Sequence, residues 1–180
     1  MAEKLVFEHT LESLLRTLEQ PYTPAQIAEL DALGINLSKP LLPGYSAEVY
    51  AGLIDLVTRQ RWPELPREQG HFEAGRAFIQ AYSETLLGRA LSGLLRTIGP
   101  HRVLERMSRT FRSANNFTET RLRKVGPASY ELWFNFASRP PFFAGMVHEV
   151  LTRCGVKQPE VKLIAGAEGT EVTFHVSWQS

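Results

Sequence analysis

The spacing of the apolar residues changes once along this chain, within the stretch from Arg109 to Arg123. Before this stretch, apolar residues recur at steps of three and four, which is the spacing of one face of a helix. After it they alternate with polar residues, as they do from Val172 to Trp178, and this alternation is typical of a strand with one buried face. The sequence therefore predicts a helical first half and a β-rich second half.

The second half contains four strand-like segments and one amphipathic helix, in the order β-β-α-β-β: 117–125, 129–136, 143–154 (the helix), 161–165 and 172–178. Short turn signals separate the strands of each pair, and strands joined by short turns pair antiparallel. We therefore expect an α+β fold in which a mainly antiparallel sheet carries a helix packed on one face.

No repeat, low-complexity segment or linker divides the chain, and 180 residues is the length of one domain. We expect a single domain, 1–180, in which a helical half (1–113) and a β-β-α-β-β half (114–180) share one core.

Several helix boundaries are visible in the first half. Thr10, Thr23 and Ser46 each precede an amphipathic run, and Ser and Thr are favoured N-caps. A longer helical pattern spans residues 67–98, where Gly75, Gly88 and Gly93 interrupt it and indicate either close packing of another element or a kink. A break between two helices is expected at 85–89, and a further helix at 101–113.

Bulk properties exclude several classes of function. The net charge is +1, whereas a protein that neutralises nucleic-acid phosphates carries a clear basic excess. No apolar run reaches the ~18 residues of a membrane span, and the first residues lack the apolar core of a signal peptide. With one cysteine no intrachain disulfide can form, which fits a reducing compartment. We expect a cytoplasmic protein that neither binds nucleic acid nor inserts into a membrane.

The common catalytic and metal motifs are absent. The sequence has no glycine-rich phosphate loop and no G-x-S-x-G nucleophile elbow. Cys154 lies on the apolar stripe of its helix, where a structural cysteine is expected. No two of the five histidines are three or four residues apart, so no local metal site is predicted. His71 and His101 are either helix-end residues or axial ligands. We expect neither an enzyme nor a bound metal or cofactor.

Positive charge gathers where the spacing changes. Residues 101–124 contain seven Arg or Lys and two Glu, a local charge of +5 on a chain whose total is +1. Such a cluster can bind an anionic ligand or an acidic partner. It can equally be a solvated surface that acidic residues balance in space. The candidate residues for binding are Arg109, Arg112 and Arg121.

Asn115 and Asn116 lie between the last helix of the first half and the first strand. They are candidates for the same ligand or partner site. They can also simply shape the corner, because asparagine makes side-chain turns and tolerates left-handed backbone.

Six segments resemble an uncharacterised paralogous family expanded in myxobacteria, a family defined by a domain of unknown function. They are L-V-F-E-H-T-L-E-S-L-L, K-P-L-L-P-G-Y, T-L-L-G-R-A-L-S-G-L-L-R, R-T-F-R-S-A-N-N-F-T-E-T-R, Y-E-L-W-F-N and V-T-F-H-V-S-W. They span nearly the whole chain. The resemblance implies no activity, because the family has none assigned.

A more distant resemblance is to the haem–nitric-oxide-binding and vinyl-reductase-type ligand-binding domains, whose fold relatives include TRAPP-type trafficking subunits. The shared outline is a helical first half, strands, the helix P-F-F-A-G-M-V-H-E-V-L and two final strands. Haem-binding members have a proximal histidine and a Y-x-S-x-R motif that holds the haem propionates. The nearest stretch here, Phe134 to Arg139, lacks the tyrosine and has Ser138 next to Arg139. The resemblance therefore implies the fold and a hydrophobic pocket between the halves.

Three functions follow from these patterns. The first is a non-enzymatic regulatory or sensory module that binds a small ligand or a protein partner, with a pocket lined by residues such as Phe78, Leu91, Phe134 and Phe143. The second is a protein-interaction or homo-oligomerisation module without a ligand. The third, and least favoured, is a haem-based gas sensor.

Overall fold

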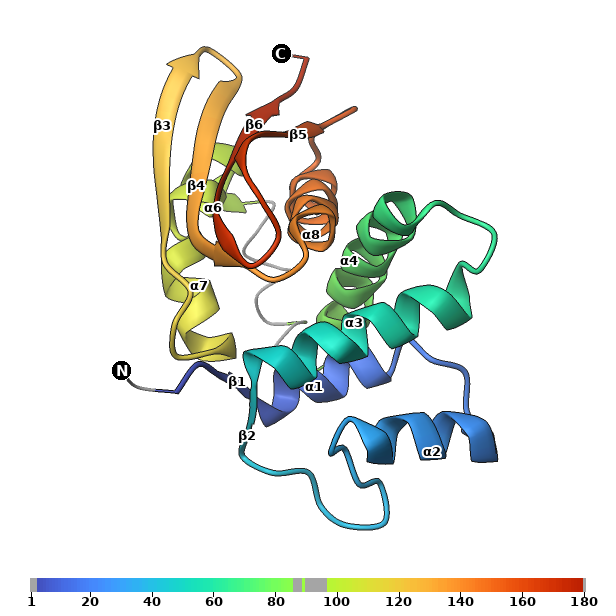
Figure 1. Ribbon diagram of the computed structural model, residues 1–180. Coiled ribbons are helices and arrows are strands. Elements are labelled where there is room, and N and C mark those ends of the chain that lie inside the picture. Colours follow the sequence, from blue (N-terminus) through green and yellow to red (C-terminus); the bar gives the residue numbers. More distant parts are fainter. Residues whose placement is uncertain (1–2, 86–88, 90–96, 180) are drawn as a thin grey trace.

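The computed structural model describes residues 3–85, 89 and 97–179. Figure 1 shows the helical half at one end of the molecule and the sheet at the other, with a single helix, α8 (Pro140–Arg153), between the sheet and α4 (Arg67–Glu84). The two halves are therefore joined through a contact between helices that lie far apart in the sequence.

In space the helical half consists of α1 (Glu8–Leu15), α2 (Pro24–Ala32), α3 (Ala47–Arg61), α4 and two short strands, β1 (Leu5–Phe7) and β2 (Gly44–Ser46), whereas the helices of residues 100–114 lie against the sheet. Thr23 caps α2 in a capping box with Gln26, and the Ser46 side chain accepts a hydrogen bond from the Val49 N–H, so both predicted caps are confirmed. The predicted cap at Thr10 is wrong, because α1 begins earlier, at Glu8.

The first strand fastens the N-terminus to the second half of the chain. β1 pairs antiparallel with β2, with Val6 opposite Tyr45. Val6 also forms an isolated bridge with Asn115, and the Thr10 hydroxyl donates to the Ala114 carbonyl over 3.1 Å. Two short strands and one side chain thus hold the end of α7 (Met107–Ala114) against the helical half.

The long helical pattern ends where a break was predicted. α4 stops at Glu84, and Thr85 follows in an extended conformation. The helix expected over 101–113 is divided into α6 (Pro100–Glu105) and α7, with Arg106 between them. The large apolar residues of these two helices are buried: Val103, Leu104, Met107 and Phe111.

Glycines allow α4 and α8 to touch backbone to backbone. A Cβ atom added to Gly75 would lie 2.0 Å from the Phe142 carbonyl oxygen, and one added to Gly145 would lie 2.0 Å from the Phe72 carbonyl oxygen. Close packing, the first of the two explanations offered for Gly75, is therefore the correct one.

The sheet has the strand order β3-β4-β6-β5, and every neighbouring pair is antiparallel. Its strands are β3 (Thr120–Gly126), β4 (Ser129–Ala137), β5 (Glu160–Gly166) and β6 (Thr170–Ser177). With α8 between β4 and β5, the chain has the predicted α+β fold and the predicted order β-β-α-β-β.

One face of the sheet is covered and the other is open. The covered face holds fully buried side chains from the central strands, including Leu132, Phe134 and Phe174. Phe134 meets Phe111 of α7 and Phe143 of α8 edge to face, so both helices pack on this side. Alternation along β4 ends at Phe134, where a register shift buries Ala137 and leaves Phe136 partly exposed.

Within the described ranges, no helix is long and apolar enough to cross a membrane.

Candidate functional site

The sheet separates the three arginines that were predicted to form a basic corner. Arg109 and Arg112 lie exposed on α7, which packs on the covered face of the sheet. Arg121 lies on the open face, where its guanidinium stacks 4.7 Å from the ring centroid of its cross-strand neighbour Trp133. The three side chains therefore do not converge on one ligand.

The two asparagines shape the corner between α7 and β3. Asn115 is buried, and its side-chain oxygen accepts hydrogen bonds from the N–H groups of Phe117 and Thr118. The sequence predicts that the first strand begins at residue 117, but β3 begins at Thr120, after the turn that these bonds form. The Asn116 side chain pairs with the backbone of Glu3 and Leu5, extending the attachment of the N-terminus.

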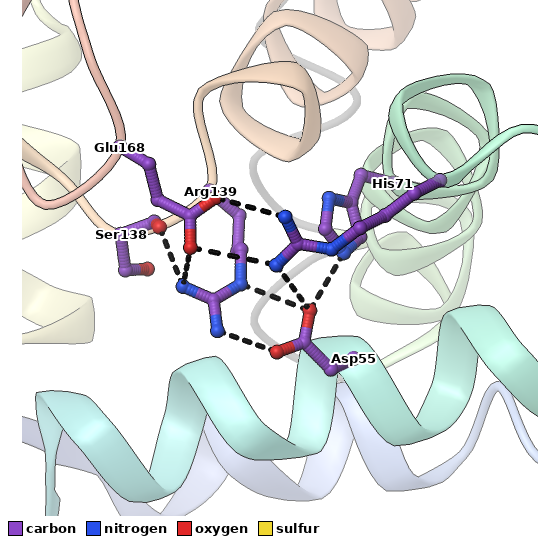
Figure 2. Close-up of polar contacts among 6 residues, drawn as sticks. Asp55, His71, Ser138, Arg139 and Glu168 are labelled. Atoms are coloured by element: carbon purple, nitrogen blue, oxygen red, sulfur yellow. Dashed lines mark hydrogen bonds and ion pairs between the residues drawn. The ribbon is translucent and has the colours of Figure 1, made fainter.

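A cluster of ionised side chains lies where the two halves meet. Arg139, at the corner between β4 and α8, donates from Nε to Asp55 Oδ1 of α3 over 2.9 Å and from Nη2 to Asp55 Oδ2. Its Nη1 lies 2.6 Å from Glu168, which belongs to the turn between β5 and β6. Arg67 also contacts Glu168 and Asp55. Figure 2 shows these side chains reaching one another from four separate segments.

The same cluster includes a buried histidine. His71 Nε2 lies 2.7 Å from Asp55 Oδ1, and this nitrogen carries the hydrogen because a carboxylate can only accept. Burial raises the pKa of Asp55, but the hydrogen bonds from Arg139 and His71 outweigh burial and hold that pKa well below its usual range.

Mutual pairing makes this cluster a structural connection. The Arg139 guanidinium uses Nε, Nη1 and Nη2 within the protein, since Nη1 also donates to the Ser138 carbonyl oxygen. Asp55 is 28% exposed and Arg139 16% exposed, so water screens the ion pair only partly. Sequence spacing carried no signal for this cluster, because the residues come from four separate segments.

An apolar cavity lies between the two halves. Its volume is about 150 Å³, and its walls come from α1, α3, α4, α6, α7 and α8 and from both sides of the α7–β3 corner. Of the four residues predicted to line a pocket, Phe78 and Phe143 do so. Phe134 packs behind Phe143 without lining the cavity, and Leu91 lies outside the described residues.

Aromatic rings make up much of the cavity wall: Tyr50, Phe78, Tyr82, Phe111, Phe117, Phe136, Phe142 and Phe143. Four buried lining residues also carry hydroxyl groups, namely Thr10, Tyr50, Thr118 and Ser138. The Thr118 hydroxyl is buried and has no hydrogen-bond partner in the described part of the protein. Burial raises the pKa of Tyr50, which keeps its hydroxyl protonated.

His101 and Cys154, two side chains considered as possible reactive groups, do not line this cavity. His101 stacks on Tyr130 at 5.3 Å between ring centroids, and its Nε2 is 3.2 Å from Glu105. Cys154 is partly buried, and burial raises its pKa to about 11, so it is a poor nucleophile. Among the described residues, no group of three or more His, Cys, Asp or Glu is placed to hold a metal ion.

Comparison with known proteins supplies a family and a fold. The model of a family described as a protein of unknown function, DUF2378, matches residues 4–179. No curated protein matches the chain.

Two solved structures of similar fold are H-NOX domains. One is the oxygen complex of an oxygen-binding H-NOX domain related to soluble guanylate cyclases, with 14% identity, a TM-score of 0.65, and 94% of this chain and 93% of that chain covered. The other is the Fe(II) unliganded H-NOX protein from K. algicida, with 13% identity, a TM-score of 0.66 and 95% of both chains covered. At these identities the likeness shows a shared fold.

Proposed function

The chain belongs to the DUF2378 family, and we propose that it is a non-enzymatic sensory module whose input is a small molecule held, without haem, in the cavity between the two halves. The observation that carries this proposal is the apolar cavity itself, since well-packed cores leave few voids larger than a water molecule. The H-NOX-like fold supports it, because one protein of that fold is an oxygen-binding domain.

The described residues do not fit a haem. The cavity of about 150 Å³ is smaller than the ~300–1,000 Å³ of pockets for drug-sized ligands, and a haem exceeds most of those ligands. No histidine or cysteine lines it along the described chain, and His101 points to Tyr130 and Glu105 instead. Arg139, in the stretch nearest to the propionate-binding motif, is already paired with Asp55 and Glu168.

The position of the cavity supports a sensory role. Phe78 of α4 forms one wall, while Phe142 and Phe143 of α8 form another. A ligand in contact with both helices stabilises the arrangement in which the halves are held together, and a ligand changes a conformational equilibrium only through such a difference in affinity. Binding in the cavity can thus alter the surface offered to a partner.

Side-chain geometry favours binding over catalysis. The described chain does contain a serine–histidine contact, in which Ser129 Oγ lies 2.8 Å from His175 Nε2. Both residues lie on the open face of the sheet and neither lines the cavity. We therefore interpret this pair as a cross-strand hydrogen bond that stabilises the sheet.

A protein partner is the second candidate, as an output surface or a homo-oligomer contact. Phe142 and Phe143, near the start of α8, are buried and offer no surface for such a contact. Leu163 and Ile164 of edge strand β5 are 46% and 53% exposed and favour this candidate. Sedimentation at high concentration tests it: a dimer that Ile164→Lys converts to a monomer supports it, and a monomer throughout contradicts it.

The test of the cavity proposal is stabilisation by small neutral ring compounds. Ligand at ten times its dissociation constant raises the free energy of unfolding by about 1.4 kcal/mol, which for this chain length raises the melting temperature by about 3–6 °C. Benzene and phenol serve as probes. At least one of them should stabilise the wild-type protein by this amount.

A cavity-filling variant with a matched control locates the binding. Ala47 lines the cavity and Ala28 is exposed on α2. Ala47→Leu should abolish the probe-dependent rise in melting temperature, and Ala28→Leu should keep it. If neither probe stabilises the wild type, or if Ala47→Leu responds as the wild type does, the cavity does not bind ligands and the proposal fails.

A further inference from the structure

One buried hydroxyl in the cavity wall has no explanation within the protein. Thr118 is 2% exposed, and its backbone N–H is used by Asn115, but its Oγ1 has no hydrogen-bond partner among the described residues. Buried polar atoms in native proteins are nearly always paired, so an unpaired one indicates a missing partner. Since Thr118 lines the cavity, a ligand there is a natural partner.

Other hydroxyls of the wall fall into two groups. Those of Thr10 and Ser83 donate to backbone carbonyls and are satisfied. Those of Tyr50 and Ser138 have no hydrogen bond within the described chain, and both residues are nearly buried. The cavity therefore offers a few hydroxyl groups in a wall that is otherwise apolar, which is how proteins fix the orientation of a small ligand.

The charges around the cavity favour a neutral ligand. Arg153 is the one ionisable Lys, Arg, Asp or Glu among the described lining residues, and its Nε is paired with Glu149 over 3.2 Å. Among these lining residues an anion would meet one cation, which already shares Glu149, and a cation would meet no carboxylate. Transfer of an unpaired ion into such surroundings is costly, whereas a neutral molecule pays no such cost.

Size and wall chemistry narrow the ligand further. An engineered apolar cavity of ~150 Å³ in another protein accepts benzene or xenon, so a single ring fills the present one. Phe78, Phe142 and Phe143 offer ring faces and edges, and aromatic pairs prefer edge-to-face or offset contact. A six-membered aromatic ring is the best match to both the cavity volume and the aromatic walls.

We infer that the ligand is an uncharged single-ring aromatic compound that carries one hydroxyl or carbonyl group, and that Thr118 Oγ1 binds this polar atom. The inference rests on the proposed function, because it specifies what the cavity holds. It assigns Thr118 a role in selecting the ligand, while the aromatic walls supply most of the contact.

The experiment compares three probes by calorimetric titration: phenol, benzene and benzoate. Wild-type protein should bind phenol at least tenfold more tightly than benzene, and benzoate, which is ionised at pH 7, at least tenfold more weakly than phenol. Thr118→Val keeps the shape of the side chain and removes the hydroxyl. It should bind phenol about tenfold more weakly and leave benzene affinity unchanged.

Thr58→Val is the matched control. Thr58 is also buried with an unpaired hydroxyl, but it contacts Gly70 and does not line the cavity. This variant should bind both probes as the wild type does. Should Thr118→Val fail to fold, Thr118→Ala takes its place, and Thr118→Ser should restore the preference for phenol.

The possible failures are distinguishable. If benzene and phenol bind equally well, the cavity binds ligands but Thr118 selects nothing, and a water molecule satisfies its hydroxyl; this result overturns the inference alone. A preference for phenol that survives in Thr118→Val also overturns it. If no probe binds, both the proposed function and the inference fail.

Discussion

Replacing Gly75 with alanine tests the backbone contact between α4 and α8 that joins the two halves. The added Cβ would lie 2.0 Å from the Phe142 carbonyl oxygen, whereas real Cβ atoms essentially never come closer than 3.0 Å. The helices must therefore separate by at least 3.0 − 2.0 = 1.0 Å. Because backbone atoms form the obstacle, no side-chain rotation can relieve it.

Two opposing terms set the size of the effect. Strain from overpacking costs about 1–3 kcal/mol, and a backbone obstacle belongs at the upper end of that range. Alanine in place of glycine within a helix recovers about 1 kcal/mol. Gly75→Ala should thus lower the free energy of unfolding by about 2 kcal/mol, and the melting temperature by about 4–8 °C.

Gly52→Ala is the matched control. Its Cβ would meet the Cδ2 atom of Leu33 at 2.6 Å, and that flexible tip can rotate away. Its stability should stay within about 1 kcal/mol of the wild type. Urea unfolding followed by circular dichroism measures both variants. Gly75→Ala as stable as Gly52→Ala would refute the close contact.

Two further predictions concern single groups. Asp55→Asn should lower the free energy of unfolding at pH 7 by about 1–3 kcal/mol, because Arg139 loses its carboxylate partner in a partly buried site. The pKa of Asp55 is depressed in the folded state, so its contribution to stability is complete above the unfolded pKa of about 4 and is lost as the pH falls through the folded pKa. Urea unfolding below pH 4 should therefore show the stability of the wild type falling more steeply with pH than that of the variant. Cys154, whose pKa burial raises to about 11, should react with iodoacetamide at pH 8 on the order of a hundredfold more slowly than a free thiol, as followed by mass spectrometry; a rate equal to that of the unfolded protein would contradict the burial.

Local signals in the sequence were enough to predict the architecture. Hydrogen bonds at Thr23 and Ser46 involve residues within three positions, so the caps are visible in the sequence. Alternation along β4 predicts one buried face from Tyr130 to Phe136; this is correct as far as Phe134 and wrong for Phe136, because the register shift after Phe134 has no local signature. Gly75 indicated close packing without naming the partner, because the partner helix begins sixty-five residues later, at Pro140.

The site was less predictable because its members come from distant segments. Arg109 and Arg121 are close in sequence, but the sheet lies between them, so a cluster of charge along the chain is not a cluster in space. Conversely, Asp55 and Arg139 are eighty-four positions apart and in contact. Thr118 gave no signal, because an unpaired hydroxyl is recognisable only when its surroundings are known.

The most direct test is a crystal structure of the protein grown with phenol and haemin together. We predict one ring between Phe78 and Phe143, with its oxygen within hydrogen-bond distance of Thr118 Oγ1, and Arg139 still paired with Asp55. A haem between the halves, with an axial side chain on its iron and Arg139 turned to its propionates, would contradict the account. So would an empty cavity at saturating phenol.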